Sequence, residues 1–303
     1  MTLIISVVMS AVSLVFGSVF WGAKPADFLD IVFVVVATMS LGLTLSIVTI
    51  KVAFVTFKRG LDPDIVVYPI MSTIADIFIT VCYIIILNAF FVFNFAGKSV
   101  IAIIILAHLL LALYIIPKNF REQDFRKNLK ESLYTMLFVS VIVNVTGTVL
   151  KNISAVVENR GREIYTVYPA LIDMVGDVGS VVGSTATTKL ALGLLRPSLS
   201  SIRYHAKTIL SAWAASIVMF FVLAVLAPAL NGTLSLPTFS NLISILLIAN
   251  VIAVSAIILL SYGISILTFQ KGLDPDNFVI PIKSSFADSL MSLALLGALV
   301  LVG

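Results

Sequence analysis

The feature that most constrains the fold of this chain is its succession of long apolar segments. A helix that crosses a membrane needs about 20 mostly apolar residues. The 303-residue sequence contains nine such segments, at residues 2–22, 28–57, 65–93, 97–116, 132–152, 167–195, 208–229, 239–269 and 277–302. Only 11% of its residues are charged, against about 25% in soluble domains. The sequence therefore predicts an all-α, polytopic integral membrane protein with about nine transmembrane helices.

The basic residues indicate which side of the membrane each loop faces. Loops between nine crossings alternate in side, and Lys and Arg favour the cytoplasmic one. Eleven basic residues lie on one side: Lys58, Arg59, Lys118, Arg121, Arg126, Lys127, Lys130, Arg196, Arg203, Lys207 and Lys271. Five lie on the other: Lys24, Lys98, Lys151, Arg160 and Arg162. We therefore expect a multi-pass protein of the cell membrane with a cytoplasmic N-terminus, a lipid bilayer as partner and no nucleic acid partner.

One motif occurs twice, 212 residues apart. Residues 56–76 read TFKRGLDPDIVVYPIMSTIAD and residues 268–288 read TFQKGLDPDNFVIPIKSSFAD, with identity at 13 of 21 positions. Each motif begins with an acidic turn, whose Asp residues we interpret mainly as helix caps. Six apolar segments separate the two turns, so both face the same side. The sequence therefore predicts two parallel repeats about a pseudo-two-fold axis normal to the membrane.

The repeat suggests a division of the chain. Residues 1–95 correspond to the last three helices of one repeat, and residues 132–303 to a whole repeat of five helices. Residues 96–131 supply a connecting transmembrane helix and a basic cytoplasmic loop. Three explanations of the incomplete first repeat stay open. The start is assigned too late, the asymmetric molecule works as it stands, or a second chain completes it.

Four aspartates lie near the middle of apolar segments. Asp76 and Asp288 each lie 11 residues into their segment, which corresponds to a depth of roughly 16 Å. Asp177 reaches a similar depth from the opposite side, and Asp173 lies on the same helical face, four residues earlier. Carboxylates at this depth are costly in lipid and usually face a cavity or a partner. We therefore expect these four residues to form a metal site.

Small polar residues accompany these aspartates. Hydroxyl groups stand on the same helical faces, and a glycine allows another helix to approach. The predicted supporting residues of the pore are Ser72, Thr73, Ser284, Ser285, Gly176 and Ser180. Oxygen ligands without histidine or thiol suit hard cations such as Mg²⁺, Mn²⁺ and Ca²⁺. Lys283 lies beside Ser284, and we expect it either to extend toward the membrane surface or to pair with an acidic turn.

At these residues the sequence resembles the MgtE-type magnesium transporters, specifically members with two fused membrane domains. The family's pattern of G-x-D-P followed by P-x-x-[ST]-x-x-D is matched within residues 60–76 and within residues 272–288. Its G-[ND]-x-G-[ST] element is matched by residues 176–180. The resemblance covers residues 132–303 as five helices and residues 1–93 as the last three.

This resemblance implies a cation pore at the two-fold interface. It implies that Asp76 and Asp288 line the pore, together with Asp177 and the backbone around Gly176. Asp173 is added from the helical face that it shares with Asp177. Asp177 stands where single-copy bacterial members usually have Asn, which adds charge to the predicted site.

We therefore predict a non-enzymatic transporter of divalent cations, with Mg²⁺ as the first choice and Mn²⁺ or Ca²⁺ as alternatives. A Na⁺- or H⁺-coupled carrier or exchanger for another cation or a small solute is the second interpretation. The site offers no aromatic or Arg side chain to hold an organic solute. Pro-Ala-Leu at residues 169–171 and Gly-Asp at residues 176–177 superficially resemble elements of an intramembrane aspartyl protease. This interpretation is disfavoured, because both elements would lie on one helix and residue 174 is Met where a glycine is expected.

Overall fold

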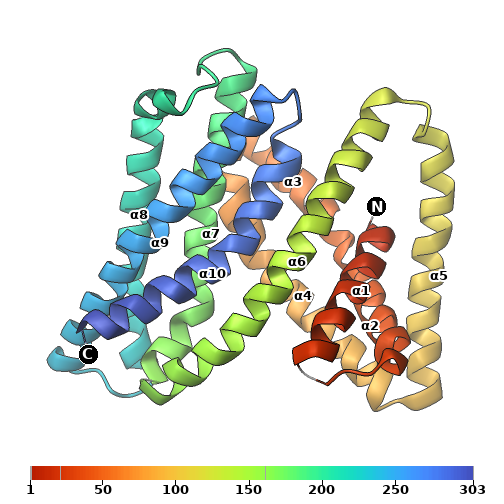
Figure 1. The fold of residues 1–303 in the computed structure, drawn as a ribbon, viewed down its shortest axis with the longest axis horizontal. Coiled ribbons are helices and arrows are strands. Elements are labelled where there is room, and N and C mark those ends of the chain that lie inside the picture. The colour runs from red at the N-terminus through yellow and green to blue at the C-terminus, as the bar shows by residue number, and fades with distance from the viewer. Residues whose placement is uncertain (1, 21, 161, 303) are drawn as a thin grey trace. The chain divides into compact units, whose positions relative to one another are not determined.

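The computed structural model describes residues 2–20, 22–160 and 162–302, and only the backbone of residues 2, 94 and 148–160. Within these ranges every regular element is a helix (Figure 1). The prediction of an all-α chain is therefore confirmed. The side chains of Lys151 and Arg160, counted above for topology, lie outside the described residues.

The helices are long and mostly apolar. In chain order they are α1 (Thr2–Phe20), η1 (Pro25–Asp27), α2 (Phe28–Gly42), α3 (Thr44–Lys58), α4 (Pro63–Phe91), α5 (Asn94–Asn119), α6 (Gln123–Arg160), α7 (Arg162–Ala191), η2 (Leu199–Ser201), α8 (Ile202–Leu230), α9 (Leu236–Gln270) and α10 (Asp276–Val302). Among the described residues, eight segments are long and apolar enough to cross a membrane. This confirms a multi-pass membrane protein. The predicted crossing 167–195, most of which is α7, is not one of the eight, since it carries many Asp, Gly, Ser and Thr residues.

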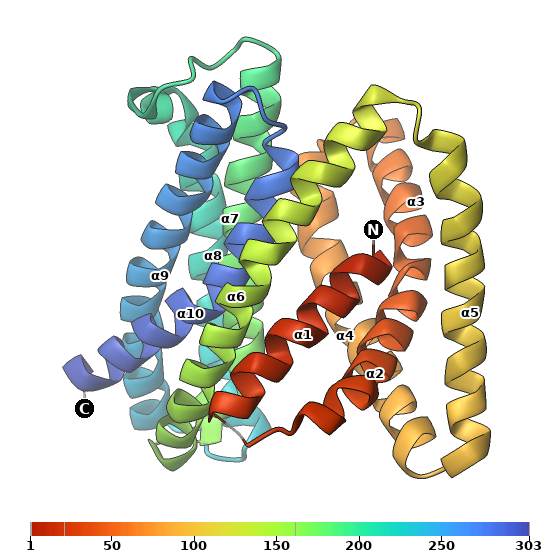
Figure 2. The same cartoon turned by 45° about the vertical axis from the view of Figure 1, so that its right-hand side comes forward.

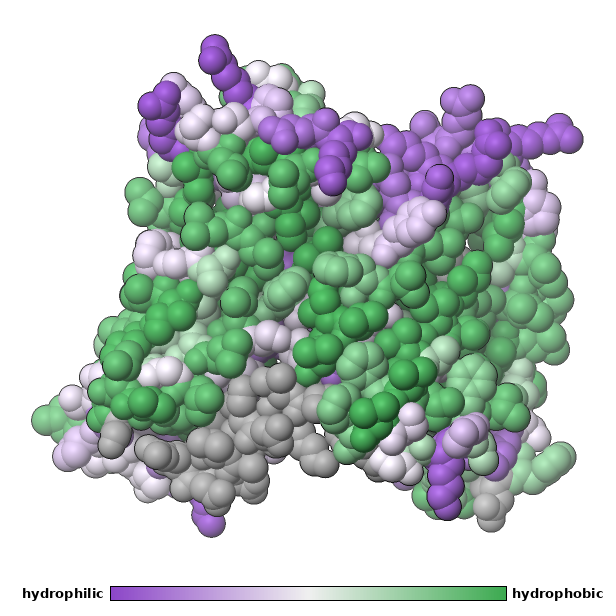
Figure 3. Space-filling view, viewed as in Figure 1, coloured by the Kyte–Doolittle hydropathy of each residue, from purple (hydrophilic) through white to green (hydrophobic). Residues whose placement is uncertain are grey.

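Hydrophobic side chains cover the length of the helices. On the face drawn in Figure 3, hydrophilic side chains gather at helix ends and hydrophobic ones lie between them. In α5, Ile103 and Leu113 are 65% and 61% exposed. Lipid tails can cover such apolar surface at no cost, whereas water cannot.

The chain divides into two compact units, Met1–Asn144 and Val145–Gly303. The boundary falls inside α6. The predicted division into 1–95, 96–131 and 132–303 rests on the duplicated motif and not on packing, and it stays a prediction.

In the first unit, α2 contacts α1, α4 and α5. Its core is small and consists of Val34, Ala37, Ile86, Phe90 and Ile101. The single predicted segment 28–57 forms two helices, because α2 ends at Gly42 and α3 begins at Thr44. Glycine weakens a helix, and hydroxyl groups beside it bond to nearby carbonyls: Thr44 Oγ1 to Leu41 O (2.8 Å) and Ser46 Oγ to Leu43 O (2.6 Å).

In the second unit, α7 packs against α8, α9 and α10 (Figures 1 and 2). Most of α7 from Val175 to Thr187 is buried. Two glycines allow this packing. A Cβ added at Gly179 would lie 2.7 Å from Ile257 Cγ1, and one at Gly183 would lie 2.4 Å from Val279 Cγ1. At these two glycines, side chains of α9 and α10 therefore lie against the backbone of α7.

The substitution Gly183→Ala tests this packing. We expect it to destabilise the second unit by about 1–3 kcal/mol, because overpacking shifts side chains and backbone. Gly297→Ala in α10 is the control, since nothing lies within 4 Å of its added Cβ. In both variants the change from glycine to alanine favours the helix by about 1 kcal/mol. The difference between their melting temperatures, measured on the purified proteins in detergent, therefore reports the cost of the steric clash. Equal melting temperatures would contradict the prediction.

The duplicated motif forms the same turn twice. In each copy the glycine has a positive φ, 72° and 69°. The next residue, a leucine, donates its N–H to a threonine carbonyl at 3.2 and 3.1 Å. The first Asp side chain accepts the backbone N–H two residues later at 3.0 and 3.1 Å. The paired residues are Gly60 and Gly272, Leu61 and Leu273, Thr56 and Thr268, and Asp62 and Asp274. The interpretation of Asp62 and Asp274 as caps is confirmed.

Candidate cation site

α7 and α10 carry three of the predicted metal-site residues in the second unit. Asp177 on α7 is buried, with 5% of its surface exposed. Asp173, one turn earlier, and Asp288 on α10 are both half-buried. Lys283 on α10 donates a hydrogen bond to the carbonyl of Gly176, the residue before Asp177. A Cβ added at Gly176 would lie 3.7 Å from the Cβ of Ala287, the residue before Asp288. The carboxylates of the three aspartates attract the ammonium group of Lys283. These four side chains therefore form one electrostatic cluster, which we call the α7–α10 charge cluster.

Lys283 connects the two helices directly. Its side chain is 5% exposed, and its Nζ donates a hydrogen bond to the carbonyl oxygen of Gly176 at 2.8 Å. The glycines of α7 make room for it. A Cβ at Gly176 would lie 3.8 Å from Lys283 Nζ, and one at Gly179 would lie 3.5 Å from Lys283 Cδ. A buried ammonium group is costly unless carboxylates and hydrogen-bond acceptors surround it, and α7 supplies both.

This position corrects both expectations for Lys283. The side chain neither extends to the membrane surface nor pairs with an acidic turn; it runs across the glycine face of α7. The carboxylates of α7 attract the ammonium group more effectively than a distant surface. The sequence contains one signal for this special position, because the equivalent residue of the first motif is the uncharged Met71.

The predicted supporting residues of the second unit differ in their surroundings. Gly176 is buried, and Ser180 is 1% exposed. Ser285 is also buried and donates its hydroxyl hydrogen to Pro281 O at 2.7 Å, whereas Ser284 is exposed. A hydroxyl oxygen that donates its hydrogen keeps lone pairs for a cation. Ser180 and Ser285 are therefore buried oxygen donors close to the charge cluster in sequence.

Three further hydrogen bonds involve α10 near Asp288. Ser292 donates its hydroxyl to the carbonyl of Asp288, and the hydroxyl groups of Tyr168 and Ser292 lie 2.5 Å apart. Ser289 and Thr146 hydroxyl groups lie 2.6 Å apart. The backbone that carries Asp288 is thus tied to α6 and α7 by neutral groups.

The remaining predicted residues belong to the first unit. Asp76 on α4 is exposed, and Ser72 and Thr73 lie one turn before it. Both hydroxyls donate to Pro69 O, at 3.3 and 3.2 Å. These are local bonds of a hydroxyl group to a carbonyl in the preceding turn of the same helix. That Asp76 joins the α7–α10 charge cluster stays a prediction.

The candidate site is not a preformed chelating centre. In the part of the chain that the structure describes, no group of three or more His, Cys, Asp or Glu residues is placed to hold a metal ion directly. Mg²⁺ dehydrates reluctantly and commonly keeps several waters. Carboxylates that act over a longer distance therefore suit an ion that travels with part of its hydration shell.

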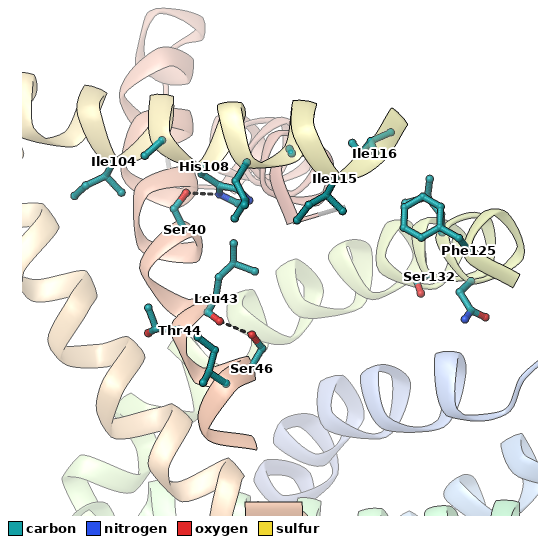
Figure 4. A pocket seen from close by; sticks show the side chains of 16 residues that line it. Ser40, Leu43, Thr44, Ser46, Ile104, His108, Ile115, Ile116, Phe125 and Ser132 are labelled. Atoms are coloured by element: carbon teal, nitrogen blue, oxygen red, sulfur yellow. Dashed lines mark hydrogen bonds between the residues drawn. The ribbon is translucent and has the colours of Figure 1, made fainter. Parts of the chain in front are cut away.

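A pocket of about 740 Å³ lies elsewhere, in the first unit (Figure 4). Its lining includes His108, whose Nδ1 lies 2.6 Å from Ser40 Oγ, and many Ile and Leu side chains. The residues that line it include no carboxylate. An apolar wall suits a hydrocarbon chain better than a divalent cation, so this pocket is not the candidate cation site.

Residues 168–298 match the family model of MgtE, a divalent cation transporter. The predicted relationship to MgtE is confirmed over this stretch. The MgtE-like stretch lies within the second unit and includes Asp173, Asp177, Lys283 and Asp288. Comparison with curated proteins and with solved structures finds no match.

The match also decides between classes of function. MgtE is a family of transporters and not of enzymes, which agrees with the non-enzymatic prediction and counts against the protease interpretation. The match implies transport of divalent cations by a multi-pass membrane protein. It covers less than half of the 303 residues, and the fusion of two copies stays a prediction.

Proposed function

We propose that this protein conducts Mg²⁺ across the cell membrane through a pore lined by Asp76, Asp173, Asp177 and Asp288. The observation that carries the proposal is the α7–α10 charge cluster inside the MgtE-like stretch. Three carboxylates within an apolar helical unit are expensive to retain without a function. A path for a doubly charged cation supplies that function.

The chemistry of the donors supports a hard cation. The proposed path offers carboxylate, hydroxyl and backbone carbonyl oxygens, and no thiol or imidazole. Such donors favour Mg²⁺, Mn²⁺ or Ca²⁺ over Zn²⁺ or copper ions. Mg²⁺ is the proposed cargo because spaced carboxylates can bind its hydrated form through water.

The direction of transport follows from the membrane potential. Moving one charge through 100 mV is worth about 2.3 kcal/mol, so a divalent ion gains about 4.6 kcal/mol. Entry into a cell with a negative interior therefore needs no coupled ion. With a cytoplasmic N-terminus, as the basic residues favour, the two acidic turns face the cytoplasm.

Flux measurements in liposomes test this function. Purified protein is reconstituted, an inside-negative potential is set with K⁺ and valinomycin, and Mg²⁺ entry is followed with an enclosed fluorescent indicator. We expect entry that rises with the potential and needs no Na⁺ or pH gradient. Protein-free liposomes with the same potential are the control. Entry no faster than in the control would overturn the proposal, and entry only with a Na⁺ or pH gradient would favour the coupled carrier.

A further inference from the structure

We propose that Lys283 is a tethered cation, which occupies the α7–α10 charge cluster until a divalent ion displaces it from the carbonyl of Gly176. This inference rests on the proposed function, because it adds a competitor at the same site. It explains a feature that divalent transport alone does not require, namely a buried positive charge among carboxylates.

The contact of Lys283 is the first reason. Its Nζ lies 2.8 Å from a backbone carbonyl oxygen, Gly176 O. Carbonyl oxygens are common ligands of hard divalent cations. The ammonium group therefore holds an oxygen that a bound ion or its water shell can use.

The charge balance is the second reason. In their ionised forms, Asp173, Asp177 and Asp288 contribute three negative charges and Lys283 contributes one positive charge. Together these four ionised side chains carry a net charge of −2, which one divalent ion balances. When no ion is present, Lys283 reduces the mutual repulsion of the carboxylates.

The space around Lys283 is the third reason. A lysine side chain is a flexible four-carbon stem. Its stem lies over the glycine face of α7, where Gly176 and Gly179 present no side chain. No side chain of Gly176 or Gly179 therefore blocks a change of the Lys283 rotamer.

The two motifs differ at this position. Met71 stands in the first copy and is also buried, with 8% exposed. Methionine resembles lysine in length but carries no charge. The first motif therefore lacks the competitor, so an ion meets unequal competition at the two motifs.

Affinity measurements on three Lys283 variants test the inference. Lys283→Gln removes the charge but keeps an N–H donor for Gly176 O, Lys283→Met copies the first motif, and Lys283→Arg keeps the charge. Binding of MgCl₂ and of MnCl₂ to the purified full chain in detergent is measured by titration calorimetry. We expect Gln and Met to tighten binding at least about tenfold, since a repelling charge is lost. Arg should stay within about threefold of the original affinity.

Lys189→Met is the matched control. Lys189 is a half-buried lysine of α7 whose Nζ bonds to His205 Nδ1 (3.2 Å) and Thr208 Oγ1 (3.1 Å), and not to Gly176 O. We expect its removal to leave divalent affinity unchanged. Such a result would show that removing a different lysine of α7 does not by itself tighten divalent binding.

The outcomes separate this inference from the proposed function. If Lys283 has only a structural role, Lys283→Met should lower thermal stability and Lys283→Gln should leave divalent affinity unchanged or weaker. Unchanged or weaker affinity of Lys283→Gln overturns the inference. If Met does not fold, Gln alone decides. Should the original protein carry Mg²⁺ in liposomes while Gln binds no more tightly, only the tethered cation fails. Should the original protein carry no divalent ion, the proposed function itself fails.

Discussion

Asp288→Asn is expected to reduce Mg²⁺ flux into liposomes at least about a hundredfold. Two unit charges 4 Å apart interact by about 4 kcal/mol at an effective dielectric constant of 20, and each 1.4 kcal/mol is tenfold. Asparagine keeps the size of the side chain and removes its charge. Since the Asp288 carbonyl and not its carboxylate accepts the Ser292 hydroxyl, the local backbone contact persists and the variant should still insert.

Asp276→Asn on the same helix is the matched control. Asp276 is exposed in the acidic turn, at the first position of α10. Its side chain lies far along the helix from the proposed path, so we expect flux close to that of the original protein. Normal flux in Asp288→Asn would remove Asp288 from the path, whatever the control shows.

Asp76→Asn is expected to act in the same direction, with a fall of at least about tenfold in Mg²⁺ flux. The reason is the predicted pore between the repeats, in which Asp76 occupies the position that Asp288 has in the second copy. Asp76 is exposed on the first unit, so replacement by asparagine should not disturb folding. The measurement is the same potential-driven flux assay.

Asp64→Asn controls for the loss of an acidic residue from α4, because Asp64 lies in the first turn of that helix. Unchanged flux in Asp76→Asn, together with low flux in Asp288→Asn, would contradict a pore formed by both repeats. It would confine the path to the second unit. Low flux in both Asp variants with normal flux in both controls would support the two-repeat pore.

The local structure of the duplicated motif could be predicted from its letters. Glycine at positive φ, a leucine and a capping Asp before a proline-led helix are short-range signals, and both copies form the same hydrogen bonds. The helical class followed equally well from apolar segment length. The break at Leu43 was not predicted, although its signals are local: Gly42 weakens the helix, and the hydroxyl groups of Thr44 and Ser46 bond to nearby carbonyls.

The charge cluster was predictable only in part. Helical spacing placed Asp173 and Asp177 on one face, and the glycines indicated that another helix would approach α7. The position of Lys283 depends on which helix fills that space, and this is a long-range property. The difference between Lys283 and Met71, at equivalent positions of the two motifs, was the sequence signal that set Lys283 apart.

Lys283 and Asp288 are both borne by α10, five residues apart. In a continuous helix this spacing fixes a separation of about 7.5 Å along the axis and an angle of about 140° around it. The two charges therefore move together when α10 moves as a rigid body. A rotation or translation of α10 that draws Lys283 away from α7 must also displace the carboxylate of Asp288, so one helix motion changes the positions of both charges.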